Sequence, residues 1–155
     1  MDNPFMARAI QLSIDNVLSA RGGPFGAVVV KEGKIVAEAA NQVTSTNDPT
    51  AHAEVSAIRE ACQRLQAFDL QGCEIYTSCE PCPMCMGAIY WARLDRVYFA
   101  NVAADAAQVG FDDSMIYREL AQDHSQRRIP MIQMMREQGL EAFRAWKNSS
   151  SKIKY

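Results

Sequence analysis

Two short segments of the sequence carry side chains that could bind a transition metal. His52 lies in the segment 49–54, and about thirty residues later Cys82 and Cys85 lie in Pro81-Cys82-Pro83-Met84-Cys85. The two cysteines are three residues apart at the predicted start of a helix, so they point the same way, and the exposed helical N–H groups there favour thiolates. Three protein ligands leave the fourth tetrahedral position open, as in a catalytic zinc site. We therefore predict one Zn²⁺ per chain, bound by His52, Cys82 and Cys85.

A carboxylate lies two residues after His52, close to this metal without being needed as a ligand. Glu54 could accept a proton from a water molecule at the metal and deliver it to a ring nitrogen and then to a departing amine. The combination H-x-E with P-C-x-x-C is typical of zinc nucleobase deaminases, and the sequence matches it completely. We therefore predict Glu54 as the catalytic residue.

A third nearby cysteine leaves a second kind of zinc site open. Cys79, Cys82 and Cys85 are evenly spaced, and with His52 they could form a closed structural site. Three thiolates on both sides of the turn at Pro81 do not converge easily, and a closed site leaves Glu54 without a role. The open site is the favoured prediction, with Cys62 and Cys73 as core residues and His124 at the surface.

The predicted secondary structure would bring these residues together. Apolar side chains at helical spacing predict a helix over residues 4–20, and two β-rich runs around a turn predict a hairpin of strands 25–30 and 35–40. A polar loop over 41–49 leads to a helix that Pro49-Thr50 opens and that runs to about residue 65. The elements expected after it are strands 74–78, 96–102 and 129–134 and helices 84–92, 114–120 and 140–147.

This order predicts an α/β fold of three layers, α/β/α, with a central mixed sheet of about five strands. Such a sheet would hold the starts of the two ligand-bearing helices side by side. A chain of 155 residues fits one domain, residues 1–155, in which 148–155 form a C-terminal tail.

Composition narrows the class of protein. Hydrophobic residues make up 48% and charged residues 22% of the chain, as in globular proteins, and the net charge of -2 argues against a nucleic-acid partner. We find no leader pattern and no apolar run long enough for a membrane span. Five cysteines, three of them within seven residues, indicate a metal rather than a disulfide framework, which predicts a cytoplasmic protein.

The sequence resembles the cytidine-deaminase-like superfamily, and within it the bacterial guanine deaminases. The likeness runs through the segments 22–27, 47–54, 77–85, 87–93 and 110–113 and on to Tyr155. It implies a zinc-dependent hydrolase that releases ammonia from a free nucleobase, with guanine converted to xanthine in purine catabolism. It also implies a homodimer, one form of which would exchange the C-terminal segments between its two subunits.

The resemblance also implies residues that bind the base. Asn41 would bind the purine edge, Phe25 and Trp91 would form walls for the ring, and Asp113 would accept hydrogen bonds from its N–H groups. Backbone groups at Ala53 and Glu80 would hold polar atoms of the substrate, and Tyr155 would close the pocket from the tail 148–155. Each residue has an ordinary alternative as well: core packing for Phe25 and Trp91, a strand end for Asn41, a helix cap for Asp113, and a frayed terminus for Tyr155.

Three other functions share part of this evidence. A tRNA adenosine deaminase has the same metal motif but needs a positive groove for RNA, and a cytosine deaminase differs only in the ring that it accepts. A zinc-stabilised interaction protein without activity would leave Glu54 unused.

Overall fold

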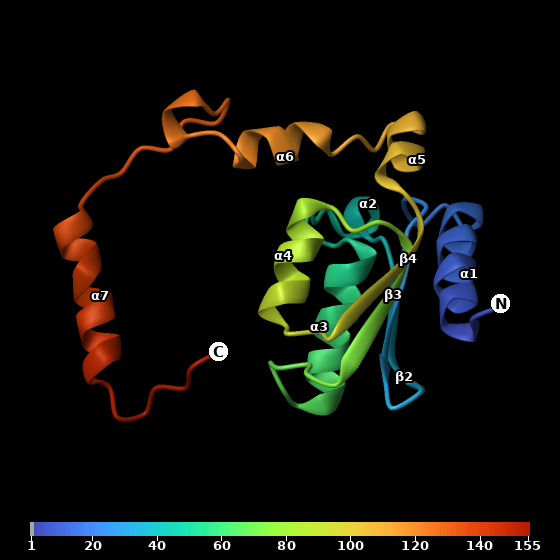
Figure 1. Ribbon diagram of the computed structural model, residues 1–155, viewed down its shortest axis with the longest axis horizontal. Coiled ribbons are helices and arrows are strands. Elements are labelled where there is room, and N and C mark those ends of the chain that lie inside the picture. Colours follow the sequence, from blue (N-terminus) through green and yellow to red (C-terminus); the bar gives the residue numbers. More distant parts are fainter. Residues whose placement is uncertain (1) are drawn as a thin grey trace. The chain divides into compact units, whose positions relative to one another are not determined.

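The computed structural model describes residues 2–155 (Figure 1). The chain divides into two compact units, Met1–Asp113 and Ser114–Tyr155, which are considered separately below.

The first unit is built on one mixed sheet. Its strands are β1 (Gly26–Lys31), β2 (Lys34–Ala40), β3 (Cys73–Cys79) and β4 (Arg96–Asn101), in the spatial order β2-β1-β3-β4. Strand β1 is antiparallel to both β2 and β3, whereas β3 and β4 are parallel. The sheet is mixed as predicted, but it has four strands rather than about five.

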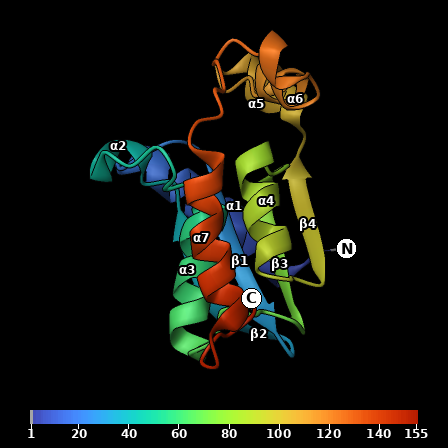
Figure 2. The ribbon, with the colours of Figure 1, turned by 90° about the vertical axis from the view of Figure 1, so that its left-hand side faces the viewer.

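Helices cover both faces of the sheet. Helix α1 (Pro4–Leu18) lies on one face, and α3 (Ala53–Leu65) and α4 (Pro83–Trp91) lie on the other (Figures 1 and 2). The predicted three-layer α/β/α fold is thus confirmed. Central strand β3 is buried against both helical layers, with Ile75 in one apolar cluster and Tyr76 in the other.

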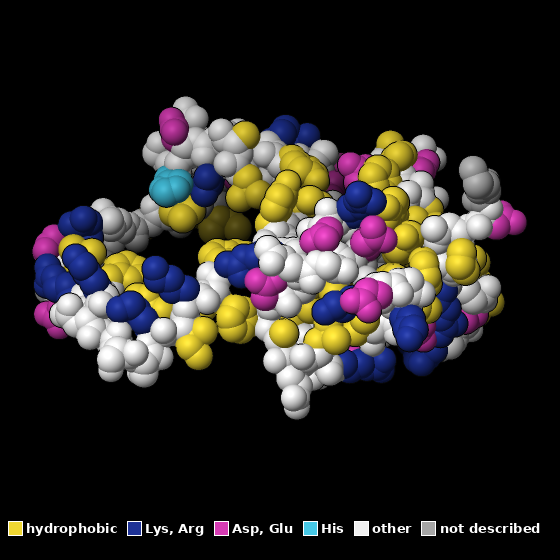
Figure 3. Space-filling view, turned by 60° about the horizontal axis from the view of Figure 1, so that its bottom comes forward, with side chains coloured by type: hydrophobic (Ala, Val, Ile, Leu, Met, Phe, Trp, Pro, Cys, Tyr) yellow, Lys and Arg dark blue, Asp and Glu magenta, His cyan; other side chains and the backbone are white. Residues whose placement is uncertain are grey.

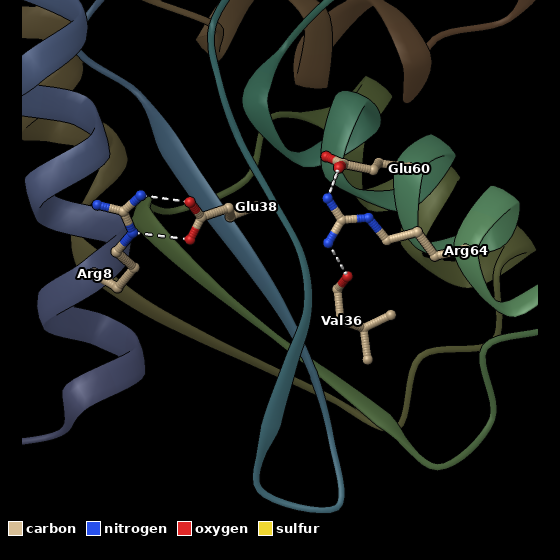
Figure 4. A network of polar contacts seen from close by, with 5 residues as sticks. All are labelled: Arg8, Val36, Glu38, Glu60 and Arg64. Carbon is tan, nitrogen blue, oxygen red and sulfur yellow. Dashed lines mark hydrogen bonds and ion pairs between the residues drawn. The ribbon is translucent and has the colours of Figure 1, made fainter.

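Edge strand β2 is bound to a helix on each side (Figure 4). Arg8 of α1 donates two hydrogen bonds to the carboxylate of Glu38, one of them with a length of 2.8 Å. From α3, Arg64 donates to the carbonyl oxygen of Val36 at 2.8 Å and pairs with Glu60. These contacts connect the hairpin to the two outer layers.

Helix α3 begins later than we expected. The sequence predicted a start at Pro49-Thr50, but Asp48 accepts hydrogen bonds from the backbone N–H and the hydroxyl of Thr50, which forms a turn instead. The chain stays extended through His52, with φ -65° and ψ 155°, and the helix starts at Ala53. The loop expected over 41–49 contains the short helix α2 (Val43–Thr46).

The second unit contains α6 (Ser114–Leu120), a 3₁₀ turn η1 (His124–Gln126) and α7 (Arg136–Asn148). The strand expected over 129–134 was wrong, because these residues pair with no described strand and are exposed. An apolar run forms a strand only where a neighbour completes its hydrogen bonds, and Pro130 lacks an N–H group to offer. No helix within residues 2–155 is long and apolar enough to cross a bilayer.

Candidate zinc centre

The metal-binding motif lies where two helices begin. His52 is the N-cap residue of α3 and Cys82 is the N-cap residue of α4, and neither side chain caps its helix. Cys85 follows in the first turn of α4. The sheet holds these two helix starts at the same end, with β3 leading directly into α4 (Figure 1).

The three predicted ligands converge. The Nδ1 atom of His52 lies 3.6 Å from the sulfur of Cys82 and 3.5 Å from that of Cys85. All three ligand atoms lie within 4.8 Å of one another. Tetrahedral zinc with ordinary Zn–S and Zn–N bond lengths separates a nitrogen and a sulfur ligand by roughly 3.6 Å. The geometry and the chemistry of this donor set therefore fit a zinc ion.

Cys79 does not belong to this cluster. Its thiol donates a long hydrogen bond to the carbonyl oxygen of Val102, at 3.8 Å. Burial raises the pKa of Cys79 to about 11, so its side chain stays a neutral thiol. Among residues 2–155, the group able to hold a metal ion consists of His52, Cys82 and Cys85. These contacts favour the open, three-ligand site over a closed one.

The pKa values of the two ligating cysteines shift in opposite directions. Hydrogen bonding from Cys85, with a smaller contribution from His52, lowers the pKa of Cys82 to about 4 against the opposing effect of burial. The same hydrogen bond and burial raise the pKa of Cys85. Cys82 is therefore the more acidic of the two thiols, and both must lose their protons to bind zinc.

Glu54 is a buried carboxylate in the first turn of α3, with 7% of its surface exposed. Burial raises its pKa, and its contact with Cys85 and the nearby imidazole of His52 lower it in part. A raised pKa suits a group that must both accept and deliver a proton near neutral pH. The predicted acid–base residue therefore lies beside the metal ligands.

The model of the cytidine and deoxycytidylate deaminase zinc-binding region matches residues 1–101. The chain belongs to this family. It is 53% identical to the guanine deaminase of Bacillus subtilis (strain 168) over 151 residues, which is 97% of each chain. The X-ray structure of guanine deaminase from Bacillus subtilis superposes with a TM-score of 0.96 at 52% identity, covering 100% of this chain and 99% of the other.

Relatives that act on RNA match a smaller part of the chain. A tRNA-specific adenosine deaminase of Aquifex aeolicus (strain VF5) is 51% identical over 77 residues, which is 50% of this chain and 51% of that protein. The resemblance to zinc deaminases, and to bacterial guanine deaminases among them, is confirmed.

Two of the residues expected to bind the base are adjacent in this member of the family. The backbone N–H of Asn41 donates to the carbonyl oxygen of Phe25 at 3.0 Å, where β2 ends beside the start of β1. Asn41 is buried, and its side-chain oxygen accepts a hydrogen bond from the N–H of Val43 at 3.2 Å. The amide oxygen thus accepts one hydrogen bond within the protein, and the NH₂ group is the part of this side chain that can donate to a ligand.

Phe111 was missed by the sequence reasoning. Its ring meets that of Phe25 edge to face, with centroids 4.9 Å apart. Only the resemblance pointed at the segment 110–113, and it drew attention to Asp113 rather than to this aromatic residue. Phe25 and Phe111 together form an apolar corner of the kind that suits a planar ring.

Helix α5 (Ala103–Gln108), which we did not predict, leads to Phe111 and Asp113. The carboxylate of Glu80 accepts a hydrogen bond from the N–H of Ala103 at 2.9 Å, so this side chain holds the start of α5. The backbone N–H of Glu80 donates to the carbonyl oxygen of Asn101 at 2.8 Å, so its own carbonyl is the backbone group left for the predicted substrate contact. After α5, Gly110 has a φ of 97° and allows the turn in which the N–H of Phe111 donates to Ala106 at 3.0 Å.

Asp113 and Ala53 lie near the cluster, whereas Trp91 does not. Burial raises the pKa of Asp113, and the negative charge of Cys82 raises it further, which places the two groups within electrostatic range. Ala53 is buried as the first residue of α3, next to His52. Trp91 is 69% exposed at the last turn of α4, about 12 Å along the helix from its first residue. Tyr155 belongs to the second unit.

Proposed function

We propose that the chain catalyses the hydrolytic deamination of guanine to xanthine and ammonia, with zinc as its cofactor. The observation that carries the proposal is the open set of three ligands, His52, Cys82 and Cys85, with the buried carboxylate of Glu54 beside it. A filled coordination sphere would leave no place for a reacting water, and a site without a carboxylate could not move its protons.

Guanine is the favoured base because the likeness to guanine deaminase extends along both units of the chain. The tRNA-specific relatives match about half of the chain. A net charge of -2 also argues against an RNA substrate, since binding a polyanion favours a basic surface.

When bound, zinc supplies a Lewis acid that lowers the pKa of water toward neutrality. Glu54 accepts the proton that this water loses and delivers it to the ring nitrogen beside the carbon that carries the amino group. Oxygen adds to that carbon, C2 in guanine. Glu54 then takes the remaining proton from the added oxygen and passes it to the amino group, and the C–N bond breaks to release ammonia as the C2 carbonyl forms.

The base would be held by the residues around the cluster. The rings of Phe25 and Phe111 contact one face or edge of the purine, the NH₂ group of Asn41 donates to its acceptor atoms, and Asp113 accepts from its N–H groups. Backbone groups at Ala53 and Glu80 orient the reacting end of the base. Tyr155 would close the pocket, whereas Trp91, exposed at the far end of α4, does not form a wall beside the zinc ligands of its own chain.

We further propose a cytoplasmic homodimer in which the C-terminal segment is exchanged. Hydrophobic side chains gather at several places on the face drawn in Figure 3. Between residues 114 and 155 no described side chain is fully buried, and Ile132 and Phe143 are among the large exposed ones. A partner would cover such surface. None of the five cysteines forms a disulfide, which suits a reducing compartment.

The test is ammonia release by the purified zinc protein from a panel of candidate substrates. The panel contains guanine, adenine, cytosine, guanosine and a tRNA anticodon stem-loop, and xanthine is measured as the expected product. Turnover of guanine well above the others supports the proposal. Preferential turnover of the stem-loop or of cytosine would mean that this molecule, and not guanine, is the substrate. If none of the candidates is turned over, the chain is a zinc-stabilised binding protein rather than an enzyme.

A further inference from the structure

A buried amide of helix α1 lies beside the residues proposed to bind the base. Asn16 is 3% exposed, and it comes from the helix on the opposite face of the sheet from α3 and α4 (Figure 1). The zinc ligands and Glu54 all belong to the other face. Asn16 is therefore outside the reacting centre.

The side-chain NH₂ group of Asn16 bridges two segments of the chain. It donates to the carbonyl oxygen of Gly23 and to that of Asn41, each at 2.9 Å. An amide nitrogen carries two hydrogens, so each carbonyl receives one. One group thereby fixes the distance between the turn that precedes Phe25 and the end of strand β2.

The space around this bridge is filled. A methyl group placed on Gly22 would lie 2.3 Å from the carbonyl oxygen of Asn41 and 2.9 Å from the side-chain nitrogen of Asn16. The chain at Gly22 thus passes so close that only glycine fits. The backbone at Gly22 therefore lies directly against both Asn16 and Asn41.

We propose that Asn16 is a positioning residue for the base pocket. By holding the carbonyls of Gly23 and Asn41, it sets where the ring of Phe25 and the side chain of Asn41 stand, and so how tightly the purine binds. This inference rests on the proposed function, in which Phe25 and Asn41 contact the base. A small displacement of a positioning group is enough to change reaction parameters strongly.

The main test is Asn16→Asp, which keeps the size of the side chain but replaces the donor with a carboxylate that repels both carbonyls. We expect KM for guanine to rise about ten-fold and kcat to fall less than about three-fold, because the interaction lost is one with the bound base rather than with the reacting atoms. Zinc content should stay at one ion per chain. Asn16→Ala, which removes the donor without adding charge, should raise KM in the same direction.

The matched control is Asn3→Asp on the same helix. Asn3 caps α1 by accepting from the N–H groups of Phe5 and Met6, and aspartate caps a helix equally well. This variant makes the same chemical change at the other end of α1 and should leave KM unaltered. If Asn16→Asp does not fold, Asn16→Ala is measured in its place and should show the same rise in KM.

The outcomes separate this inference from the function on which it rests. A folded Asn16→Asp or Asn16→Ala protein that is less stable to urea but keeps the wild-type KM overturns the positioning role and leaves guanine deamination intact. If the wild-type protein releases no ammonia from guanine, the proposed function fails. The same KM comparison is then made with whichever amino-substituted base the wild type does turn over, and a protein that turns over none overturns both.

Discussion

The thiol of Cys79 donates to the carbonyl oxygen of Val102, although three cysteines within seven residues could have shared one metal. This contact ties the end of β3 to the residue before α5. It keeps a sulfur out of the zinc cluster, whose ligands are His52, Cys82 and Cys85. The role of each cysteine can therefore be tested with the same substitution.

Cys79→Ser should keep one zinc per chain and most of its activity, whereas Cys82→Ser should lose at least about 100-fold in zinc affinity, more than outer-shell changes typically cost. The reason is that serine replaces a neutral thiol at Cys79 but a thiolate ligand of the metal at Cys82. Zinc content by mass spectrometry and a competition titration with a chelator measure the difference. Equal zinc loss in both variants would mean that Cys79 is a ligand and that the site is closed.

Glu54→Gln should retain zinc and lower kcat about 10²–10⁴-fold, the usual contribution of a general acid–base group. Glutamine keeps the size of the side chain but cannot shuttle a proton. Ammonia release and zinc content are measured on the same preparation. A variant with wild-type turnover would remove Glu54 from the proposed mechanism.

Deletion of residues 149–155 should raise KM for guanine or abolish turnover, while the first unit stays folded and loaded with zinc. Steady-state kinetics and circular dichroism of the truncated protein test this. Tyr155→Ala should show the same direction of change if the ring is what closes the pocket. Unaltered kinetics in the truncated protein would remove the tail from the site.

A mixing experiment extends this prediction to the exchanged dimer. Glu54→Gln chains with an intact tail are combined with truncated chains that retain Glu54. If tails are exchanged, the mixed dimer has one complete site, and activity appears that neither variant shows alone. Without exchange, every site lacks either its carboxylate or its tail, and the mixture stays inactive.

The Arg8–Glu38 ion pair should give a stability increment that depends on pH. The hydrogen bond from Arg8 holds the pKa of Glu38 below its ordinary value, so the folded state favours the charged form. Its contribution is complete above the unfolded pKa of about 4.3 and is lost as pH falls through the lower folded value. Because both side chains are about one-third exposed, we expect Glu38→Gln to cost about 0.5–1 kcal/mol near pH 7.

Urea unfolding of the wild type and of Glu38→Gln between pH 7 and pH 3 measures this increment. The matched control is Glu60→Gln, which removes an i,i+4 pair with Arg64 and should cost no more than about 0.5 kcal/mol. A difference between Glu38→Gln and wild type that grows as pH falls would contradict the assigned pKa direction.

The metal site was predictable because the residues of each half of the site lie close together in the sequence. Cys82 and Cys85 are one helical turn apart, and His52 and Glu54 are two residues apart, so each half of the site follows from its own segment. Parallel pairing of β3 with β4 then places α4 beside α3. Nothing beyond alternating strands and helices was needed to bring the halves together.

Two of the parts that sequence reasoning missed depend on distant residues, and the third depends on a local turn that competes with a helix. Helix α5 is held at its start by Glu80, which lies 23 residues earlier. The start of α3 was misplaced because Asp48 forms a turn with Thr50 that competes with the helix. The segment 129–134 has apolar side chains but no neighbouring strand within the described chain. The helix or strand propensity of a segment gives no information on its distant hydrogen-bonding partners or neighbouring strands.

The order of the elements along the chain has a consequence for biosynthesis. All three zinc ligands precede residue 86, and the last strand ends at Asn101, well before the unit Ser114–Tyr155 begins. Because nascent chains fold from their N-terminal part onward, the sheet and its zinc ligands assemble before the C-terminal unit folds. We therefore expect a ribosome-stalled fragment that exposes residues 1–113 to bind zinc before the second unit has folded.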